Sequence, residues 1–169
     1  MPVFSIIMLI PALLLIALSI KRVPAGQVWI HERFGRYITE LKPGIHFLLP
    51  FIDGIATKVQ TGEWQVGVTL PDGTSADNHP LEIDVDVRYA IRKPADTYYK
   101  TSNSPERMLV SIVCAHLKAH CMGMPLQEVL REPFMDANIL LPITNKDARE
   151  YGLEIIDIKI AAMRSPRYS

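Results

Sequence analysis

The chain has 169 residues and a formal net charge of zero, with 18 Lys and Arg residues against 18 Asp and Glu. This balance argues against a nucleic-acid binder, which normally carries a basic excess, and against an acidic disordered tail. The two cysteines are too few for a disulfide-stapled miniprotein. All of the charges fall after residue 20, so we interpret the sequence as a soluble domain behind an apolar leader.

Residues 1–20 form an uncharged apolar run, followed directly by Lys21 and Arg22. Twenty helical residues rise about 30 Å, which matches the hydrocarbon core of a bilayer, so we expect a membrane anchor over residues 1–20. The candidate anchor residues are Ile6, Leu9, Pro11, Leu14 and Ile16. The alternatives are a core helix of a soluble protein and a cleaved signal peptide, which the small residues at 17 and 19 favour and the absence of a preceding basic residue opposes.

Pro11 lies in the middle of this run and allows two membrane arrangements. It would kink a single-pass helix, or it would turn a re-entrant hairpin whose ten-residue arms, each about 15 Å long, stay in one leaflet. We favour the single-pass helix. Lys21 and Arg22 favour a cytoplasmic position for the domain that follows, but the side of the membrane stays open.

Residues 21–72 are rich in strand and turn patterns. The expected strands lie near residues 28–34, 55–60 and 63–70. The expected turns lie at Gly35, residues 41–44 and residues 71–73. Residues 45–52 form an apolar stretch that Pro50 interrupts.

Residues 81–91 carry the clearest strand pattern, because apolar and polar side chains alternate throughout. Glu82, Asp84 and Asp86 lie in a row on the polar side and do not converge, so we interpret them as a solvated sheet face and not as a metal site. A last strand is expected over residues 153–160. Its two faces would carry Ile156, Ile158 and Ile160 on one side and Ile155, Asp157 and Lys159 on the other.

Helices are expected between these two strands. Ser104 as N-cap and Pro105 at the first helical position begin the best-defined helix, which should run to about Met122. The other expected helices cover residues 94–99, 125–131 and 133–152. Pro142 should bend or break the last of them.

The helix from Ser104 holds both cysteines and a pair of histidines, His116 and His120, at the i,i+4 spacing that can bind zinc. On a helical wheel the histidines fall about 200° and 240° from Cys114, while Cys121 falls about 20° from it. The two pairs therefore cannot share one ion. Both histidines fall on the apolar face, so we expect either core residues or a candidate interface with a partner subunit, with a metal site completed from elsewhere as the third alternative.

Catalytic motifs are absent from the sequence. It has no Gly-rich phosphate loop, no G-x-S-x-G and no H-E-x-x-H. We therefore expect no enzymatic activity, no cofactor and no resident metal.

The first third of the domain contains three distinctive blocks: Val23-Pro24-Ala25-Gly26-Gln27, then Glu32-Arg33-Phe34-Gly35-Arg36-Tyr37, then residues 41–53, Leu-Lys-Pro-Gly-Ile-His-Phe-Leu-Leu-Pro-Phe-Ile-Asp. In these blocks and their spacing the sequence resembles the superfamily of stomatin, prohibitin, flotillin and erlin, known as the SPFH or band 7 domain. Fainter matches continue to Tyr151-Gly152-Leu153-Glu154-Ile155. A few positions look erlin-like, but they do not assign a subfamily.

The resemblance implies an α/β (α+β) fold with two lobes. We expect a membrane anchor over residues 1–20, a β-rich membrane-proximal lobe over residues 21–72 and an α/β lobe over residues 73–169. By analogy with the family, a membrane-surface lip would dip into the bilayer surface. The lip consists of Phe47, Leu48, Leu49, Phe51 and Ile52. The alternative for these residues is an ordinary buried strand and turn.

The resemblance also implies a function without an active site. Members of the family form rings or cages that enclose a membrane patch, organise lipids, and regulate proteases, channels or other membrane proteins. We therefore expect a membrane-anchored scaffold whose partners are membrane lipid and either further copies of itself or longer SPFH relatives, with an unidentified membrane-protein client. The alternatives are a soluble or secreted binding domain with a cleaved leader, and a metal-binding protein that uses His116 and His120.

The sequence departs from the family pattern at two places. Relatives usually continue into a long Ala/Glu-rich helix that forms a coiled coil, and this sequence ends at Ser169 without one. Pro133 and Pro142 fall where a helix would normally run through. We therefore expect a short member, a fragment, or a variant that joins assemblies built by longer relatives.

Overall fold

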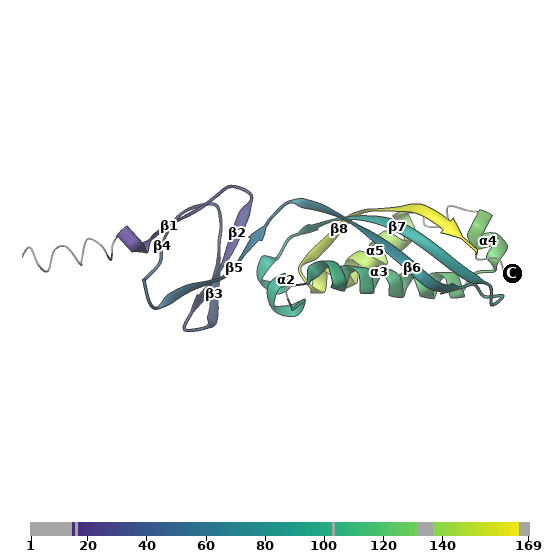
Figure 1. Cartoon of the computed structure of the whole chain (residues 1–169), viewed down its shortest axis with the longest axis horizontal. Helices are drawn as coiled ribbons and strands as arrows, with labels where there is room; N and C mark the ends of the chain where they lie inside the picture. Colours follow the sequence, from purple (N-terminus) through teal and green to yellow (C-terminus); the bar gives the residue numbers. More distant parts are fainter. Residues whose placement is uncertain (1–14, 16, 103, 132–136, 166–169) are drawn as a thin grey trace, which may run out of the picture. The chain divides into compact units, whose positions relative to one another are not determined.

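The computed structural model of the chain describes residue 15 and residues 17–102, 104–131 and 137–165. The chain divides into two compact units, Met1–Thr61 and Gly62–Ser169. The strands and helices of each unit are labelled in Figure 1. The division falls after Thr61, whereas the boundary expected after residue 72 lies inside a continuous strand, β6 (Glu63–Thr74).

The described part of the first unit is built from a two-stranded ribbon and a three-stranded sheet, all antiparallel. The ribbon pairs β1 (Ile20–Val23) with β4 (Gly44–Phe47). The sheet has the order β3 (Arg36–Leu41), β2 (Gln27–Arg33) and β5 (Asp53–Gln60). The small core cluster of this unit consists of Val23, Trp29, Leu41 and Leu48, with Ile55 packed against it.

The second unit is a three-stranded antiparallel sheet with helices on one face (Figure 1). The strand order is β6, β7 (Pro80–Ile91) and β8 (Leu153–Arg164). The helices are α2 (Pro94–Lys100), α3 (Pro105–Met122), α4 (Leu126–Arg131) and α5 (Ala137–Glu150). Helix α3 packs against β6 and α5 packs against β8. The mixed α/β class expected from the sequence is thus confirmed.

The alternation along β7 explains where the core of the second unit lies. The five alternating side chains from residue 81 to residue 89 are at most 2% exposed: Leu81, Ile83, Val85, Val87 and Tyr89. The buried side chains Leu109, Val113 and Leu117 of α3 pack in the same cluster. Residues spaced by three or four along a helix share one face, and residues spaced by two share one face of a strand, so both patterns converge on one apolar layer.

Two local expectations are wrong, and each has a backbone reason. The turn expected at residues 71–73 is a β-bulge, because β6 keeps pairing with β7 on both sides of it. A second bulge in β8 makes Ile155 and Ile158 face the core together, at 2% and 5% exposed, since Ile156 is the extra residue. Of the two effects expected of Pro142, a bend or a break, the break does not occur, because helix α5 continues through this residue.

Only the end of the apolar leader can be compared with the structure. Leu15 and residues 17–19 are helical. The candidate anchor residues Ile6, Leu9, Pro11, Leu14 and Ile16 lie outside the described residues. Among the residues that are described, no helix is long and apolar enough to cross a membrane.

Candidate functional site

The β1–β4 ribbon presents apolar side chains on one face. Ile20 is opposite Phe47 and Arg22 is opposite Ile45, and residues opposite each other in an antiparallel pair project to the same side. Ile45 and Phe47 are 73% and 69% exposed. Alternation sends Val23 to the other side, where it is buried. We call the outer side, with Ile20, Arg22, Ile45 and Phe47, the ribbon face.

The loop between β4 and β5 exposes most of its apolar residues. Phe51 is 93% exposed, and Leu49 and Ile52 are also exposed. Leu48 is the exception in the expected lip, because it is 5% exposed and packs into the core of the first unit. Its assignment to the surface is wrong, since the alternation that exposes Phe47 turns the next side chain inward.

A buried carboxylate holds this loop in place. Asp53 Oδ2 accepts a hydrogen bond from the backbone N–H of Leu49 at 2.8 Å. Arg33 donates from Nε to Oδ1 at 2.7 Å and from Nη2 to Oδ2 at 3.3 Å, and His31 Nε2 lies 3.1 Å from Oδ1. The side chain of Asp53 is 2% exposed. The Arg33 guanidinium, together with the Leu49 amide, holds the pKa of the Asp53 carboxyl well below its usual range.

The hairpin between β2 and β3 adds an aromatic side chain to the same region. Phe34 is 78% exposed, and its backbone N–H donates to the carbonyl oxygen of Ile52 at 3.3 Å. Phe34 and Phe51 both have positive φ, 51° and 72°, which is costly for residues other than glycine. We call Phe34, Leu49, Phe51 and Ile52 the loop tip.

Two features of this region were not predicted from the sequence pattern, namely the exposed Phe34 and the clamp formed by Arg33 and Asp53. Their signal was available in part, because Asp53 directly follows the apolar run and Phe34-Gly35 ends a strand pattern. The pairing of Arg33 with Asp53 depends on the register of β2 against β5, which the sequence pattern did not specify.

An open hollow of about 300 Å³ lies beneath the loop. Its lining residues are Leu18, Lys21, Leu48, Leu49, Pro50, Phe51, Asp53 and Ile55. Six of these are apolar, and the two charged ones come from β1 and from the start of β5.

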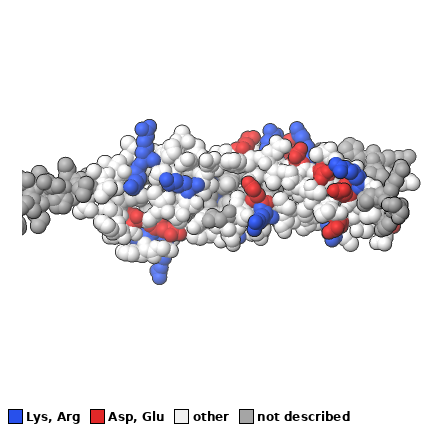
Figure 2. Space-filling model, viewed as in Figure 1, with Lys and Arg blue, Asp and Glu red and all other residues white. Residues whose placement is uncertain are grey.

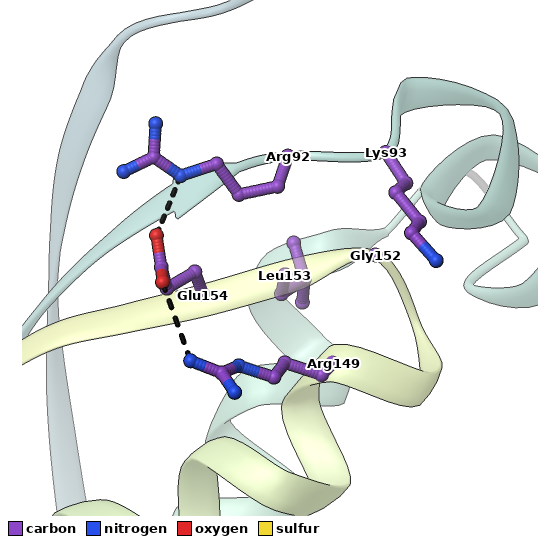
Figure 3. Close-up of a pocket in the computed structure, with 6 residues that line it drawn as sticks. All are labelled: Arg92, Lys93, Arg149, Gly152, Leu153 and Glu154. Carbon is purple, nitrogen blue, oxygen red and sulfur yellow. Dashed lines mark hydrogen bonds and ion pairs between the residues drawn. The ribbon is translucent and has the colours of Figure 1, made fainter.

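The second unit has a pocket of a different chemistry, about 270 Å³ in volume (Figure 3). Arg92 and Arg149 approach Glu154 from opposite sides, while Lys93 points away from it (Figure 3). Arg92 Nε donates to Glu154 Oε2 at 2.5 Å, and Arg149 Nη2 lies 3.5 Å from Oε1. The bond from Arg92, with the charge of Arg149, lowers the pKa of the Glu154 carboxyl.

Gly152 closes the wall of this pocket. Its carbonyl oxygen accepts hydrogen bonds from the backbone N–H groups of Arg92 and Lys93 at 2.9 and 3.0 Å. Its φ is +76°, and a Cβ at this position would overlap the Lys93 carbonyl oxygen. The pocket is therefore a junction between the start of β8 and the segment after β7, with its central carboxylate already paired.

The two histidines of α3 have different surroundings. His116 Nε2 lies 2.7 Å from Asp147 Oδ2 of α5, and both His116 and His120 are half-buried. Burial raises the pKa of both cysteine thiols, Cys114 and Cys121, which disfavours the reactive thiolate. Among the described residues, no group of three or more His, Cys, Asp or Glu side chains is placed to hold a metal ion.

The two units differ in charge although the chain as a whole is neutral. The first unit contains six Lys and Arg residues against three Asp and Glu, and the second contains twelve against fifteen. Blue and red side chains are intermingled over the sheet of the second unit in Figure 2, in keeping with ion pairs such as that between Arg88 and Asp157. In the first unit, white side chains predominate between separate blue and red ones in the same view (Figure 2).

A comparison with known families gives a match over most of the chain. The model described as "SPFH domain / Band 7 family" matches residues 21–168. The match includes both units of the structure and begins directly after the apolar leader.

Curated proteins similar to the chain include stomatin-like proteins. Stomatin-like protein stl-1 of Caenorhabditis elegans is 26% identical over 148 residues, which cover 87% of this chain and 45% of that protein. Stomatin-like protein 2, mitochondrial, of Homo sapiens is 26% identical over 145 residues, 85% of this chain and 40% of that protein. An uncharacterized protein of Mycobacterium tuberculosis is 24% identical over 164 residues, which cover 97% of this chain and 43% of that protein. The chain thus spans less than half the length of these relatives.

Proposed function

The chain belongs to the SPFH domain / Band 7 family, and from that premise we propose that it is a non-enzymatic, membrane-associated scaffold. In this proposal it is anchored by its apolar leader and self-associates or joins longer relatives. It organises a membrane patch or regulates membrane proteins there. The loop tip and the ribbon face of the first unit contact the bilayer surface.

The observation that carries the proposal is the 93% exposure of Phe51 on a loop that is clamped at its base. Burying one such side chain in an apolar environment is favourable by about 1.5–3 kcal/mol. The Arg33–Asp53 pair and the bond from the Leu49 amide hold the loop in an exposed conformation. A fixed apolar projection next to a candidate anchor is the arrangement expected of an interfacial contact.

The contact with lipid is tested by fluorescence quenching. The full chain is reconstituted in nanodiscs of phosphatidylcholine that carries brominated acyl chains, and Phe51→Trp is compared with Met122→Trp. Met122 is also exposed, at 57%, but belongs to the second unit. We expect the added tryptophan at position 51 to be quenched more strongly than the one at position 122. Equal quenching at both positions, or none at position 51, would contradict the membrane contact.

Self-association is tested by the native mass of the full chain extracted in mild detergent. A discrete assembly larger than one chain supports the scaffold proposal. A monomer under these conditions contradicts self-association, and co-extraction with a longer relative would then be required for a scaffold role.

A further inference from the structure

The hollow beneath the loop of the first unit combines apolar walls with one available cation. Leu18, Leu49 and Phe51 are exposed side chains that line it, and Leu48 closes its inner side. Its volume, about 300 Å³, lies at the lower end of the range for small-molecule pockets, roughly 300–1,000 Å³. Mostly apolar walls with few polar groups are typical of ligand sites.

The two charged residues of the lining differ in whether their charged groups already have partners. Both oxygens of the Asp53 carboxylate accept hydrogen bonds, from Arg33 and from the Leu49 amide. Lys21 is exposed, and its ammonium group makes no ion pair or hydrogen bond with any residue that the structure describes. Because Arg33 compensates the charge of Asp53, the hollow keeps the positive charge of Lys21.

The register of the ribbon separates Lys21 from its neighbour. Lys21 is opposite His46, and Arg22 is opposite Ile45 on the ribbon face, so the two cations project to opposite sides. His46 Nε2 donates to the carbonyl oxygen of Lys42 at 2.7 Å. The imidazole is therefore engaged away from the Lys21 ammonium.

We propose that this hollow binds the phosphate-bearing headgroup of an anionic phospholipid, with the Lys21 ammonium on the phosphate and Leu18, Leu49 and Phe51 against the upper acyl chains. The inference rests on the proposed membrane contact and adds the lipid class and the residue that selects it. A free phosphate would leave the apolar walls without a partner. A zwitterionic headgroup would bring a second cation into a hollow that is already positive.

The test measures lipid retention by native mass spectrometry of the full chain in mild detergent, with phosphatidylglycerol and phosphatidylcholine of matched acyl chains added in parallel. The matched variants are Lys21→Gln and Lys42→Gln, which remove one positive charge each from the first unit. Lys42 is exposed in the turn between β3 and β4 and does not line the hollow. We expect Lys21→Gln to lower the preference for phosphatidylglycerol about fivefold, the size expected for one lysine beside an anionic headgroup. Lys42→Gln should keep most of the preference.

Several outcomes would overturn the proposal. An equal loss in both variants would indicate a general basic surface and no specific hollow. If the parent chain showed no preference for phosphatidylglycerol over phosphatidylcholine, the hollow would not select anionic phospholipids. Competition by inorganic phosphate as strong as that by phosphatidylglycerol would indicate a free-anion site. Thermal unfolding of both variants should match that of the parent chain, because both side chains are exposed.

The two proposals can fail separately. Quenching at position 51 without a phosphatidylglycerol preference leaves the membrane contact standing and removes the lipid site. A phosphatidylglycerol preference that depends on Lys21, without quenching at position 51, leaves the hollow as a lipid site and removes the membrane-contacting loop.

Discussion

The exposed surfaces of the two units of the chain differ in chemical character, one charged and the other apolar. On the open face of the sheet in the second unit, charged side chains pair with each other, as Arg88 does with Asp157 at 3.3 Å and Arg164 with Asp84 at 3.4 Å. In the first unit, the ribbon face and the loop tip are mainly apolar. Exposed ion pairs are well solvated, whereas apolar surface gains free energy by leaving water. The charged sheet face of the second unit is therefore stable in contact with water, whereas the apolar surface of the first unit favours contact with a partner.

The interiors differ in the same sense. The second unit has an extended core formed by side chains from its three strands and from helices α3 and α5. The core cluster of the first unit is a small group around Trp29 and Leu48. We infer that the second unit supplies most of the folding stability, while the first devotes a larger part of its apolar side chains to external contact.

The largest effect that would test this difference is expected from Leu117→Ala. Leu117 is fully buried in the core of the second unit, so its truncation removes apolar burial and leaves a cavity, at a cost of about 2–5 kcal/mol. Leu48→Ala in the first unit should cost less, because a small core under an open loop can collapse around the gap. Chemical unfolding followed by circular dichroism measures both changes.

Met122→Ala is the control for this comparison, since Met122 is 57% exposed and its truncation should change the free energy of unfolding by less than about 0.5 kcal/mol. If Leu48→Ala proved as destabilising as Leu117→Ala, the first unit would hold a core as demanding as that of the second. The division of roles between the units would then be wrong.

A smaller effect is expected from a pair of glycine substitutions, one in each unit. Gly26 and Gly152 have nearly the same positive φ, +79° and +76°, so alanine at either position pays a backbone cost of about 1–2 kcal/mol. No atom lies within 4 Å of a Cβ built at Gly26, whereas at Gly152 the Cβ would overlap Lys93 and stand 2.9 Å from Thr97 Oγ1. Gly152→Ala should therefore be the more destabilising.

Thermal unfolding of the two glycine variants measures this difference directly, because the conformational cost is common to both. The difference in destabilisation between Gly152→Ala and Gly26→Ala therefore measures how tightly the start of β8 packs against the segment after β7. Equal destabilisation of the two variants would mean that the backbone around Gly152 shifts to accommodate the added Cβ, and that the charged pocket beside it can change its shape.

The elements of the second unit with a regular local pattern were predicted well, for a physical reason. The alternation of β7 and the spacing of α3 are read from residues close together in the chain, and both agree with the burial observed. The errors in β8 and at residues 71–73 come from bulges, which insert one residue and shift the pattern. Pro142 was expected to bend or break its helix, and the helix continues through it without a break.

The candidate site depends on pairings that a sequence pattern does not contain. The apolar stretch at residues 45–52 was visible, and its exposed residues Phe47, Leu49 and Phe51 were among those expected at the surface. The inward position of Leu48, the contribution of Phe34 and the clamp from Arg33 to Asp53 all follow from the pairing of β1 with β4 and of β2 with β5. Register over such distances is set by the whole unit.

The most local effect is expected from Asp53→Asn. An amide offers one acceptor oxygen in place of two and turns an N–H₂ group toward Arg33 or Leu49, so the loop loses part of its clamp. Hydrogen exchange at the Leu49 amide should be faster than in the parent chain, with little change in global unfolding. Asp84→Asn, which alters a carboxylate bonded to Thr69 on the second unit, should leave the Leu49 amide unchanged.

The pH dependence of the same amide follows from the lowered pKa of Asp53. Because the folded-state pKa lies below the unfolded value of about 3.9, the contribution of the carboxylate is complete above that value and is lost only as the pH falls through the lower, folded-state pKa. The protection factor of the Leu49 amide should therefore stay constant from neutral pH to about pH 4. A decline already at pH 5–6 would contradict the dependence of the loop on the Asp53 carboxylate.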